Sequence, residues 1–261
     1  MNILDKIVFD KRKEVDLRKK LIPVNQLENS VLFGRKTNSL ANALRTSETG
    51  IIAEHKRRSP SKAEINYNLN VQDVATGYEK AGVSGMSVLT DSKYFGGSLD
   101  DLIITRSSCN LPLLRKEFII DEYQILEAKA YGADVILLIA AILTQNEIKA
   151  LSEFAKQLKL DVLLEVHNEK ELHKSIIPSI DMLGVNNRDL KTFTVSLETS
   201  KNLSSLIPDD FVKVSESGIS STEAITELKP YGYKGFLIGE NFMKTEDPGL
   251  HALKFINQLT K

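Results

Sequence analysis

An acid and a base lie close together at the end of a short apolar segment early in the chain. The apolar pair Ile51 and Ile52 is followed by Ala-Glu-His-Lys-Arg-Arg-Ser-Pro-Ser-Lys over residues 53–62. Alternate side chains of a strand share a face, so Glu54 and Lys56 would point to the same side. Burying a carboxylate beside an ammonium costs free energy unless the two groups pair or act on a ligand. This stretch therefore indicates an enzyme.

The turn after this segment has the composition of an anion site. Ser59-Pro60-Ser61-Lys62 supplies hydroxyls, backbone N–H groups and a cation. Hydroxyls and backbone N–H groups donate hydrogen bonds to anions, and a lysine adds charge. We expect an anionic part of a ligand here, with Ser59 among its contacts.

Length and composition exclude several classes of protein. The chain has 261 residues, 42% hydrophobic and 26% charged, which is typical of a globular domain and is a common length for an α/β barrel. Lys and Arg total 34 against 35 Asp and Glu, so no net field favours nucleic acid or a membrane surface. The single cysteine, Cys109, excludes an internal disulfide and fits a reducing cytoplasm. No apolar run reaches the roughly 20 residues of a membrane span.

A strand-then-helix alternation begins at residue 51. The strand candidates are short and rich in leucine and β-branched residues, like parallel strands buried on both faces; they cover 51–56, 86–90, 111–118, 135–139, 162–166, 182–186, 211–215 and 236–239. Amphipathic helix candidates include 71–81, 121–130, 144–158 and 220–228. We expect Asp121, Thr144 and Ser220 to be N-caps and Gly82, Gly132 and Gly232 to end helices.

Eight such strands predict an α/β fold of the (β/α)₈ TIM-barrel type. A doubly wound open sheet would more often have about five or six strands and a Gly-x-Gly-x-x-Gly motif after the first, where this chain has Ser-Pro-Ser-Lys. We expect a single domain over 1–261, with an N-terminal helical extension of one or two helices over 1–50 and the barrel over 51–261. Acids interleave the basic residues of the extension, which favours a helix packed on the protein over a targeting segment or a membrane-surface helix.

Polar residues gather where the predicted strands end, which in a TIM barrel is where the active site lies. Lys116 ends the third strand and Glu165 the fifth; the sixth and seventh are followed by Asn186, Arg188, Glu216, Ser217 and Gly218. Taken singly, a charged residue at a strand end is more often solvated than catalytic, and Asn or Ser-Gly often caps a helix. Together, two lysines and three glutamates would meet in one concave mouth, where their interactions separate their pKa values into useful acids and bases.

The loops after the seventh and eighth strands have the usual place of a phosphate site in such barrels. They read Glu-Ser-Gly-Ile-Ser and Ile-Gly-Glu-Asn, with Gly218 and Gly239 allowing backbone N–H groups to face an anion. Leu237 lies two residues before the second glycine and Glu240 directly after it. The alternative is that either glycine serves only the geometry of its turn.

These motifs together resemble the indole-3-glycerol phosphate synthase family, nearly from end to end. The matching segments, in family order, are Ile-Leu-Asp-Lys-Ile-Val-Phe-Asp-Lys-Arg-Lys-Glu-Val, Ala-Glu-His-Lys-Arg-Arg-Ser-Pro-Ser-Lys, Leu-Thr-Asp-Ser-Lys-Tyr-Phe-Gly-Gly-Ser, Leu-Arg-Lys-Glu-Phe-Ile-Ile-Asp, Gly-Ala-Asp-Val-Ile-Leu-Leu-Ile, Leu-Leu-Glu-Val-His, Asn-Asn-Arg-Asp-Leu and Ser-Glu-Ser-Gly-Ile. Two positions depart from the family pattern: Ala63 stands where glycine is usual, and Glu117 where aspartate is usual. The first would stiffen the loop, and the second is expected to face away from Lys116.

The resemblance implies a lyase of tryptophan biosynthesis. Such an enzyme closes the ring of 1-(2-carboxyphenylamino)-1-deoxyribulose 5-phosphate with loss of carbon dioxide and water. It implies Lys116 as the general acid of ring closure and Glu165 as the base of dehydration. Lys56 would be a second acid and a partner of the substrate carboxylate, and Glu54 and Asn186 would orient the lysine and the substrate hydroxyls. No metal or cofactor is expected, because the iminium formed on ring closure accepts the electrons of decarboxylation.

The remaining expected site residues bind substrate. Phe95, Phe118 and Leu137 are candidates to line a pocket for the aromatic ring, with simple core packing as the alternative for each phenylalanine. The full binding set is Ser59, Phe95, Phe118, Arg188, Glu216, Ser217, Gly218, Leu237, Gly239 and Glu240.

Two other functions fit parts of the pattern. Phosphoribosylanthranilate isomerase is a barrel with a related substrate, but it typically uses a cysteine and an aspartate, and the only cysteine here, Cys109, lies before the third strand. A catalytically inert phosphate-binding scaffold would have no need for Lys56, Lys116 and Glu165 together. The expected ligand is a phosphorylated small molecule, without nucleic acid or membrane, and the expected state is a monomer or at most a weak homodimer.

Overall fold

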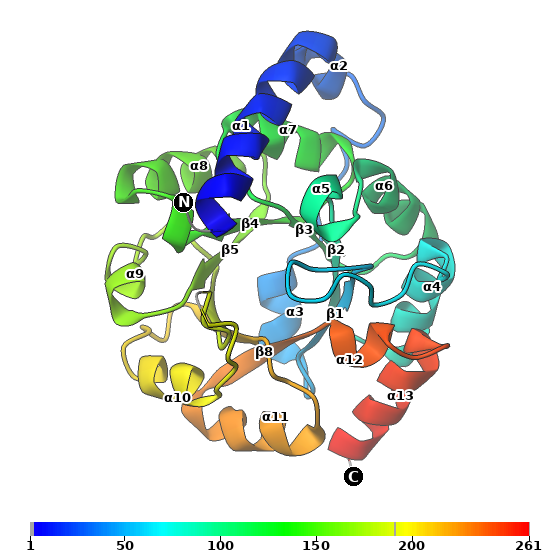
Figure 1. Cartoon of the computed structure of the whole chain (residues 1–261), viewed down its shortest axis with the longest axis vertical. Coiled ribbons are helices and arrows are strands. Elements are labelled where there is room, and N and C mark those ends of the chain that lie inside the picture. The colour runs from blue at the N-terminus through cyan, green and yellow to red at the C-terminus, as the bar shows by residue number, and fades with distance from the viewer. Residues whose placement is uncertain (1–2, 191, 261) are drawn as a thin grey trace.

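The chain forms a closed barrel of eight parallel strands in sequence order, as predicted (Figure 1). The computed structural model describes residues 3–190 and 192–260. The strands are β1 (Ile51–His55), β2 (Gly85–Leu89), β3 (Leu113–Lys116), β4 (Val135–Ile139), β5 (Asp161–Val166), β6 (Met182–Asn186), β7 (Val212–Glu216) and β8 (Tyr233–Ile238). Their bounds agree with the predicted segments within a few residues. The largest differences are at β3, which is shorter than 111–118, and at β8, which starts before residue 236.

Helices surround the strands on the outside of the barrel. They are α4 (Val71–Ala81), α5 (Ser92–Phe95), α6 (Leu99–Ser108), α7 (Glu122–Ala130), α8 (Gln145–Gln157), α9 (Glu169–His173), α10 (Glu198–Ser204), α11 (Thr222–Leu228), α12 (Glu240–Met243) and α13 (Pro248–Leu259), with short 3₁₀ turns η1 (Ala140–Ile142) and η2 (Lys229–Tyr231).

Two of the three predicted N-caps are confirmed. The side chain of Asp121 accepts a hydrogen bond from the backbone N–H of Tyr123, and Thr144 forms a full capping box with Glu147. The third prediction is wrong: the N-cap of α11 is Ser221, not Ser220, and its side chain makes no capping hydrogen bond. Consecutive serines present the same side chain at both positions, so the sequence does not distinguish them. The glycines predicted to end helices all have left-handed backbones, with φ of 80° at Gly82, 90° at Gly132 and 85° at Gly232.

The core has an inner and an outer layer. Ile52, Leu114, Leu163 and Met182 belong to a buried cluster inside the barrel, and a larger cluster fills the space between strands and helices. Helix α3 (Leu40–Thr46) contributes Leu40 and Leu44 to the inner cluster, just before β1 begins. It therefore covers the N-terminal end of the barrel.

Three helices precede β1, one more than the upper expectation: α1 (Ile3–Leu21), α2 (Val24–Glu28) and α3. Helix α1 packs on the barrel, as expected, through ion pairs of Lys11 with Glu117 at 3.0 Å and of Lys19 with Asp121 at 2.6 Å. No helix in the described part of the chain combines the length and apolarity needed to cross a membrane. The division into an extension over 1–50 and a barrel over 51–261 within one domain stays a prediction. Its end residues 1, 2 and 261 lie outside the described part.

Candidate active site

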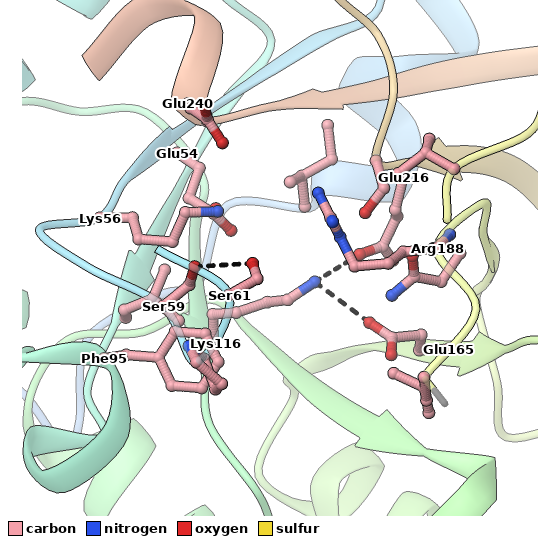
Figure 2. Close-up of a pocket in the computed structure, with 18 of the residues that line it drawn as sticks. Glu54, Lys56, Ser59, Ser61, Phe95, Lys116, Glu165, Arg188, Glu216 and Glu240 are labelled. Atoms are coloured by element: carbon pink, nitrogen blue, oxygen red, sulfur yellow. Dashed lines mark hydrogen bonds and ion pairs between the residues drawn. The ribbon is translucent and has the colours of Figure 1, made fainter. Parts of the chain in front are cut away.

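A cavity of about 420 Å³ opens at the C-terminal ends of the strands (Figure 2). Every site residue predicted from the sequence lines it, namely Glu54, Lys56, Ser59, Phe95, Lys116, Phe118, Glu165, Asn186, Arg188, Glu216, Ser217, Gly218, Leu237, Gly239 and Glu240. The structure therefore brings all of them together from separate strands. Parallel strands end at one rim of the barrel, which is why residues far apart in the chain meet here.

Lys116 lies at the centre of the charged part of the cavity. Its Nζ lies 3.3 Å from Oε2 of Glu165 and also contacts Oε2 of Glu216. Burial by itself would lower the pKa of Lys116, but the attraction of Glu216, Glu165 and Glu54 outweighs it and raises that pKa above its ordinary value. Lys116 is therefore a cation at neutral pH, able to donate a proton to an oxygen that becomes an alkoxide.

For Glu216, burial outweighs the attraction of its charged neighbour Lys116. Burial raises its pKa to about 7, helped by repulsion from Glu165 and opposed by Lys116. Its Oε1 is buried and has no hydrogen-bond partner among the described residues. A Cβ at Gly184 on the neighbouring strand would lie 2.4 Å from this oxygen, so only glycine leaves room for the carboxyl group. Near neutral pH, Glu216 can hold or release a proton beside Lys116.

Glu165 is held as a carboxylate. Burial raises its pKa, but the charges of Lys116 and His167 and a hydrogen bond with Asn186 lower it by more. The pKa of Glu165 is therefore below its ordinary value. A side chain that is ionised, buried and facing the cavity can accept a proton from a bound ligand. His167 was not among the predicted site residues, although its position two after Glu165 on a strand end signals the same face.

Glu54 and Lys56 form the pair expected on the first strand. Nζ of Lys56 lies 2.7 Å from Oε1 of Glu54, and the hydroxyl of Ser87 donates to Oε2 at 3.4 Å. Burial raises the pKa of Glu54, but Lys56 and Lys116 together bring it below its ordinary value. A Cβ at Gly239 would lie 2.5 Å from Oε1 of Glu54, so this glycine is needed for close approach.

One wall of the cavity is apolar. The rings of Phe95 and Phe118 are tilted at 42° with centroids 5.9 Å apart, and Leu137 lies on the same wall. Ile3, Leu4 and Ile7 of α1 also line the cavity. The spacing of these residues fits one face of a helix, and nothing in it distinguishes a cavity wall from core. An apolar wall beside a charged one suits a ligand with an aromatic ring and polar groups.

The rim on the β7 and β8 side is built from tight turns. Ser217 and Gly218 have successive left-handed backbones, with φ of 65° and 81°, and Asn187 donates from its side chain to the carbonyl of Ser217 at 3.0 Å. Across the mouth, the hydroxyls of Ser59 and Ser61 are 3.2 Å apart. Lys62 of the same turn is 2.8 Å from Glu240. The turns at Ser59, Ser61, Ser217 and Gly218 thus line the part of the cavity expected to bind an anion.

The two departures from the family pattern lie away from the reacting groups. Glu117 binds Lys11 at 3.0 Å and accepts a hydrogen bond from Thr90 at 2.8 Å, so its carboxylate faces away from Lys116, as expected. Ala63 is exposed, and the predicted stiffening of its loop stays a prediction.

Cys109 is buried, does not line the cavity, and has a pKa raised by burial. No group of three or more His, Cys, Asp or Glu side chains in the described residues is arranged to hold a metal ion.

Comparison with known proteins agrees with this geometry. The family model described as indole-3-glycerol phosphate synthase matches residues 4–255. Proteins named indole-3-glycerol phosphate synthase from Bacteroides thetaiotaomicron and Caldanaerobacter subterraneus are 46% and 44% identical, covering 99% and 94% of this chain and equal shares of their own. Among solved structures, KGPDC from Streptococcus mutans matches with a TM-score of 0.62 at 13% identity, over 80% of this chain and 96% of the other, which supports the barrel fold alone.

Proposed function

The chain belongs to the indole-3-glycerol phosphate synthase family, and from that premise we propose how its cavity residues carry the reaction. The enzyme converts 1-(2-carboxyphenylamino)-1-deoxyribulose 5-phosphate to indole-3-glycerol phosphate, with loss of carbon dioxide and water, in tryptophan biosynthesis. The reaction forms one carbon–carbon bond and needs an acid for the carbonyl oxygen and an acid and a base for dehydration.

Lys116 is the general acid of ring closure. The ring carbon that bears the carboxylate attacks the ribulose carbonyl while the aniline nitrogen supplies its electron pair and becomes an iminium. Nζ of Lys116 gives a proton to the carbonyl oxygen, which becomes a hydroxyl. The raised pKa of Lys116 keeps this proton available, and the buried setting strengthens its attraction to the developing alkoxide.

Carbon dioxide then leaves the same ring carbon, and the electrons of the broken bond return to the iminium and restore the aromatic ring. Lys56 follows the end of β1, and its Nζ lies beside Glu54 in the cavity. It is the partner of the substrate carboxylate before this step. The apolar wall of Phe95 and Phe118 holds the ring against the carbonyl and excludes water.

Dehydration completes the indole. Glu165 removes a proton from the carbon next to nitrogen, while Lys56 protonates the departing hydroxyl as second acid. Glu54 orients Lys56 through their 2.7 Å ion pair, and Asn186 orients Glu165 and the substrate hydroxyls. Positioned acids and bases of this kind each contribute about 10²- to 10⁴-fold.

The phosphate binds between the turns that follow β6, β7, β8 and β1. Its proposed contacts are Ser59, Arg188 and the backbone around Ser217, Gly218, Leu237, Gly239 and Glu240. Support comes from the turns at Gly218 and Gly239 and from the guanidinium of Arg188, which is fixed by its 3.2 Å hydrogen bond to the carbonyl of Phe193.

The single observation that carries these assignments is the position of Lys116 between Glu165 and Glu216 in one cavity with an apolar wall. The test is to supply the carboxyphenylamino substrate and follow indole fluorescence together with carbon dioxide release. Phosphoribosylanthranilate is supplied in parallel as the substrate of the isomerase alternative. Turnover of phosphoribosylanthranilate alone would overturn the assignment, and turnover of neither would favour an inert binding protein.

The phosphorylated substrate is the small-molecule ligand of the chain. We further propose a cytoplasmic enzyme that acts as a monomer or at most a weak homodimer. Reduced Cys109 supports the compartment. Sedimentation across a range of protein concentrations tests the assembly state, and a concentration-independent dimer would contradict it.

A further inference from the structure

His167 links the proposed base to a second carboxylate outside the cavity. Its Nε2 lies 3.4 Å from Oε1 of Glu165 on β5, and its Nδ1 lies 3.1 Å from Oε2 of Glu171 on α9. The same Glu171 oxygen accepts the backbone N–H of His167 at 2.9 Å, and Asn168 donates to the other oxygen at 2.8 Å. Glu171 is therefore fixed, and it in turn fixes the plane of the His167 ring.

The His167 ring makes ion pairs with Glu165 and Glu171, and no ion pair with any other described residue. Its Nε2 is buried and makes no hydrogen bond in the described residues. Among those residues, Glu165 is the one acidic group at ion-pair distance from that atom, at 3.4 Å. The charged groups that act on the ring are Glu171 from α9, Glu165 from β5 and Glu216 from β7, all acidic. Burial opposes the charged ring, but these carboxylates outweigh it and raise the pKa of His167.

We propose that His167, as an imidazolium, is a positioning residue that holds Oε1 of Glu165 and so directs Oε2 toward Lys116 and the substrate. The inference rests on the proposed role of Glu165 as base of dehydration. The two oxygens of Glu165 then have separate tasks: Oε1 faces His167 at 3.4 Å, and Oε2 faces Lys116 at 3.3 Å. A carboxylate held from both sides cannot rotate away from the substrate, which is how an adjacent group supports a catalytic one.

The first test measures the coupling without any turnover. The ring of His167 is titrated by NMR in the protein and in Glu165→Gln, and its signal is assigned by its loss in His167→Gln. Since coupling between two sites is reciprocal, removing the Glu165 charge should lower the His167 pKa by about one unit. An unchanged His167 titration would overturn the proposal, whatever Glu165 does in the reaction.

The second test is kinetic and uses a matched control. His173 also pairs with a glutamate four residues away, Glu169, at 3.1 Å, but both side chains are 63% exposed. We expect His167→Leu to lower kcat about ten- to a hundredfold with KM within about threefold, by analogy with other residues that orient a functional group. His167→Gln, which keeps an N–H donor at this position, should lose less, and His173→Gln should match the unsubstituted enzyme.

The pH profile separates positioning from simple loss of structure. Because His167 lowers the pKa of Glu165, the acid limb of kcat should move upward by about one pH unit in His167→Leu. Unshifted acid limbs in both His167 variants would overturn the proposal, even if thermal melting showed some loss of stability. If the His167 pKa does fall in Glu165→Gln but that variant dehydrates the intermediate normally, the proposed role of Glu165 as base is contradicted, and the contact between His167 and Glu165 is not.

Discussion

Nζ of Lys116 lies 3.3 Å from Oε2 of Glu165, so the proposed acid and base of the reaction are paired with each other in the free enzyme. The pair keeps both groups charged in a buried site, where either alone would shift toward its neutral form. In the proposed mechanism, the carbonyl oxygen of the substrate replaces a carboxylate as the partner of Lys116. The pairing thus keeps Lys116 protonated and Glu165 ionised, which are the states that the proposed acid and base need.

Lys116→Met should abolish turnover while leaving substrate affinity within about tenfold. The lost ammonium acts mainly on the alkoxide, which is present only in the transition state. Rates of indole formation and equilibrium binding of the substrate measure the two quantities. Lys149→Met, at a side chain that is 63% exposed, is the control. A kcat near that of the unsubstituted enzyme would remove Lys116 from the role of acid.

Inorganic phosphate and sulfate should compete with the substrate at the rim formed by Gly218, Gly239 and Ser59. Gly218→Ala should raise the inhibition constant of sulfate, because the new Cβ would lie 2.6 Å from Val195 and displace the loop. Gly82→Ala is a matched control: its φ of 80° is nearly that of Gly218 at 81°, but no atom lies within 4 Å of its added Cβ. Equal effects of both substitutions, or sulfate bound elsewhere in a crystal, would contradict the site.

Glu216→Gln should change how stability depends on pH. The carboxyl of Glu216 has an ordinary pKa of 4.5, which applies to the unfolded chain, and a pKa of about 7 in the folded protein. Its contribution to stability is therefore present at low pH and is lost as the pH rises through about 7. From about pH 5 to about pH 8 this loss amounts to roughly 2–3 kcal/mol at 1.36 kcal/mol per pKa unit.

Urea unfolding at about pH 5 and at about pH 8 measures how the free energy of unfolding depends on pH. The free energy of unfolding should fall more steeply with pH in the unsubstituted protein than in Glu216→Gln. Glu153→Gln, at an exposed carboxylate, should keep the steeper dependence. Parallel curves for the two variants would show that the pKa of Glu216 is not raised in the folded protein.

The barrel and the residues that line its cavity could be predicted from sequence because both follow local rules. Short apolar runs define the strands, and a polar residue such as Glu165 at the end of such a run must lie at the rim. Period two then places Glu54 and Lys56 on one side, which their 2.7 Å ion pair bears out.

The partners of these residues could not be predicted, because they depend on distances between elements far apart in the chain. The sequence places Lys116 and Glu216, one hundred residues later, at the same mouth, but it does not indicate that Glu216 contacts Nζ of Lys116. The same holds for Ile3 and Ile7, whose helix face is compatible with either core or cavity wall. The shift from Ser220 to Ser221 at α11 is a difference of one residue, within the uncertainty of any helix start.

The last prediction concerns the order of events after ring closure. Glu165→Gln keeps the shape and hydrogen bonding of the side chain but cannot accept a proton at neutral pH. If Glu165 is the base of dehydration, ring closure and decarboxylation should persist while indole formation becomes slow. Rapid mixing should therefore show a burst of carbon dioxide of about one per active site, with slow growth of indole fluorescence.

Two further measurements complete the argument. Lys116→Met should show no burst, because it blocks ring closure, which comes before carbon dioxide leaves. Equal slowing of both signals in Glu165→Gln, without a burst, would mean that Glu165 acts earlier, by holding Lys116 at 3.3 Å or by placing the substrate carboxylate. The base would then be sought in Glu54 and Glu216. Of these, Glu216 has the pKa of about 7 that suits proton exchange near neutral pH, so Glu216→Gln should be the variant that accumulates the decarboxylated intermediate.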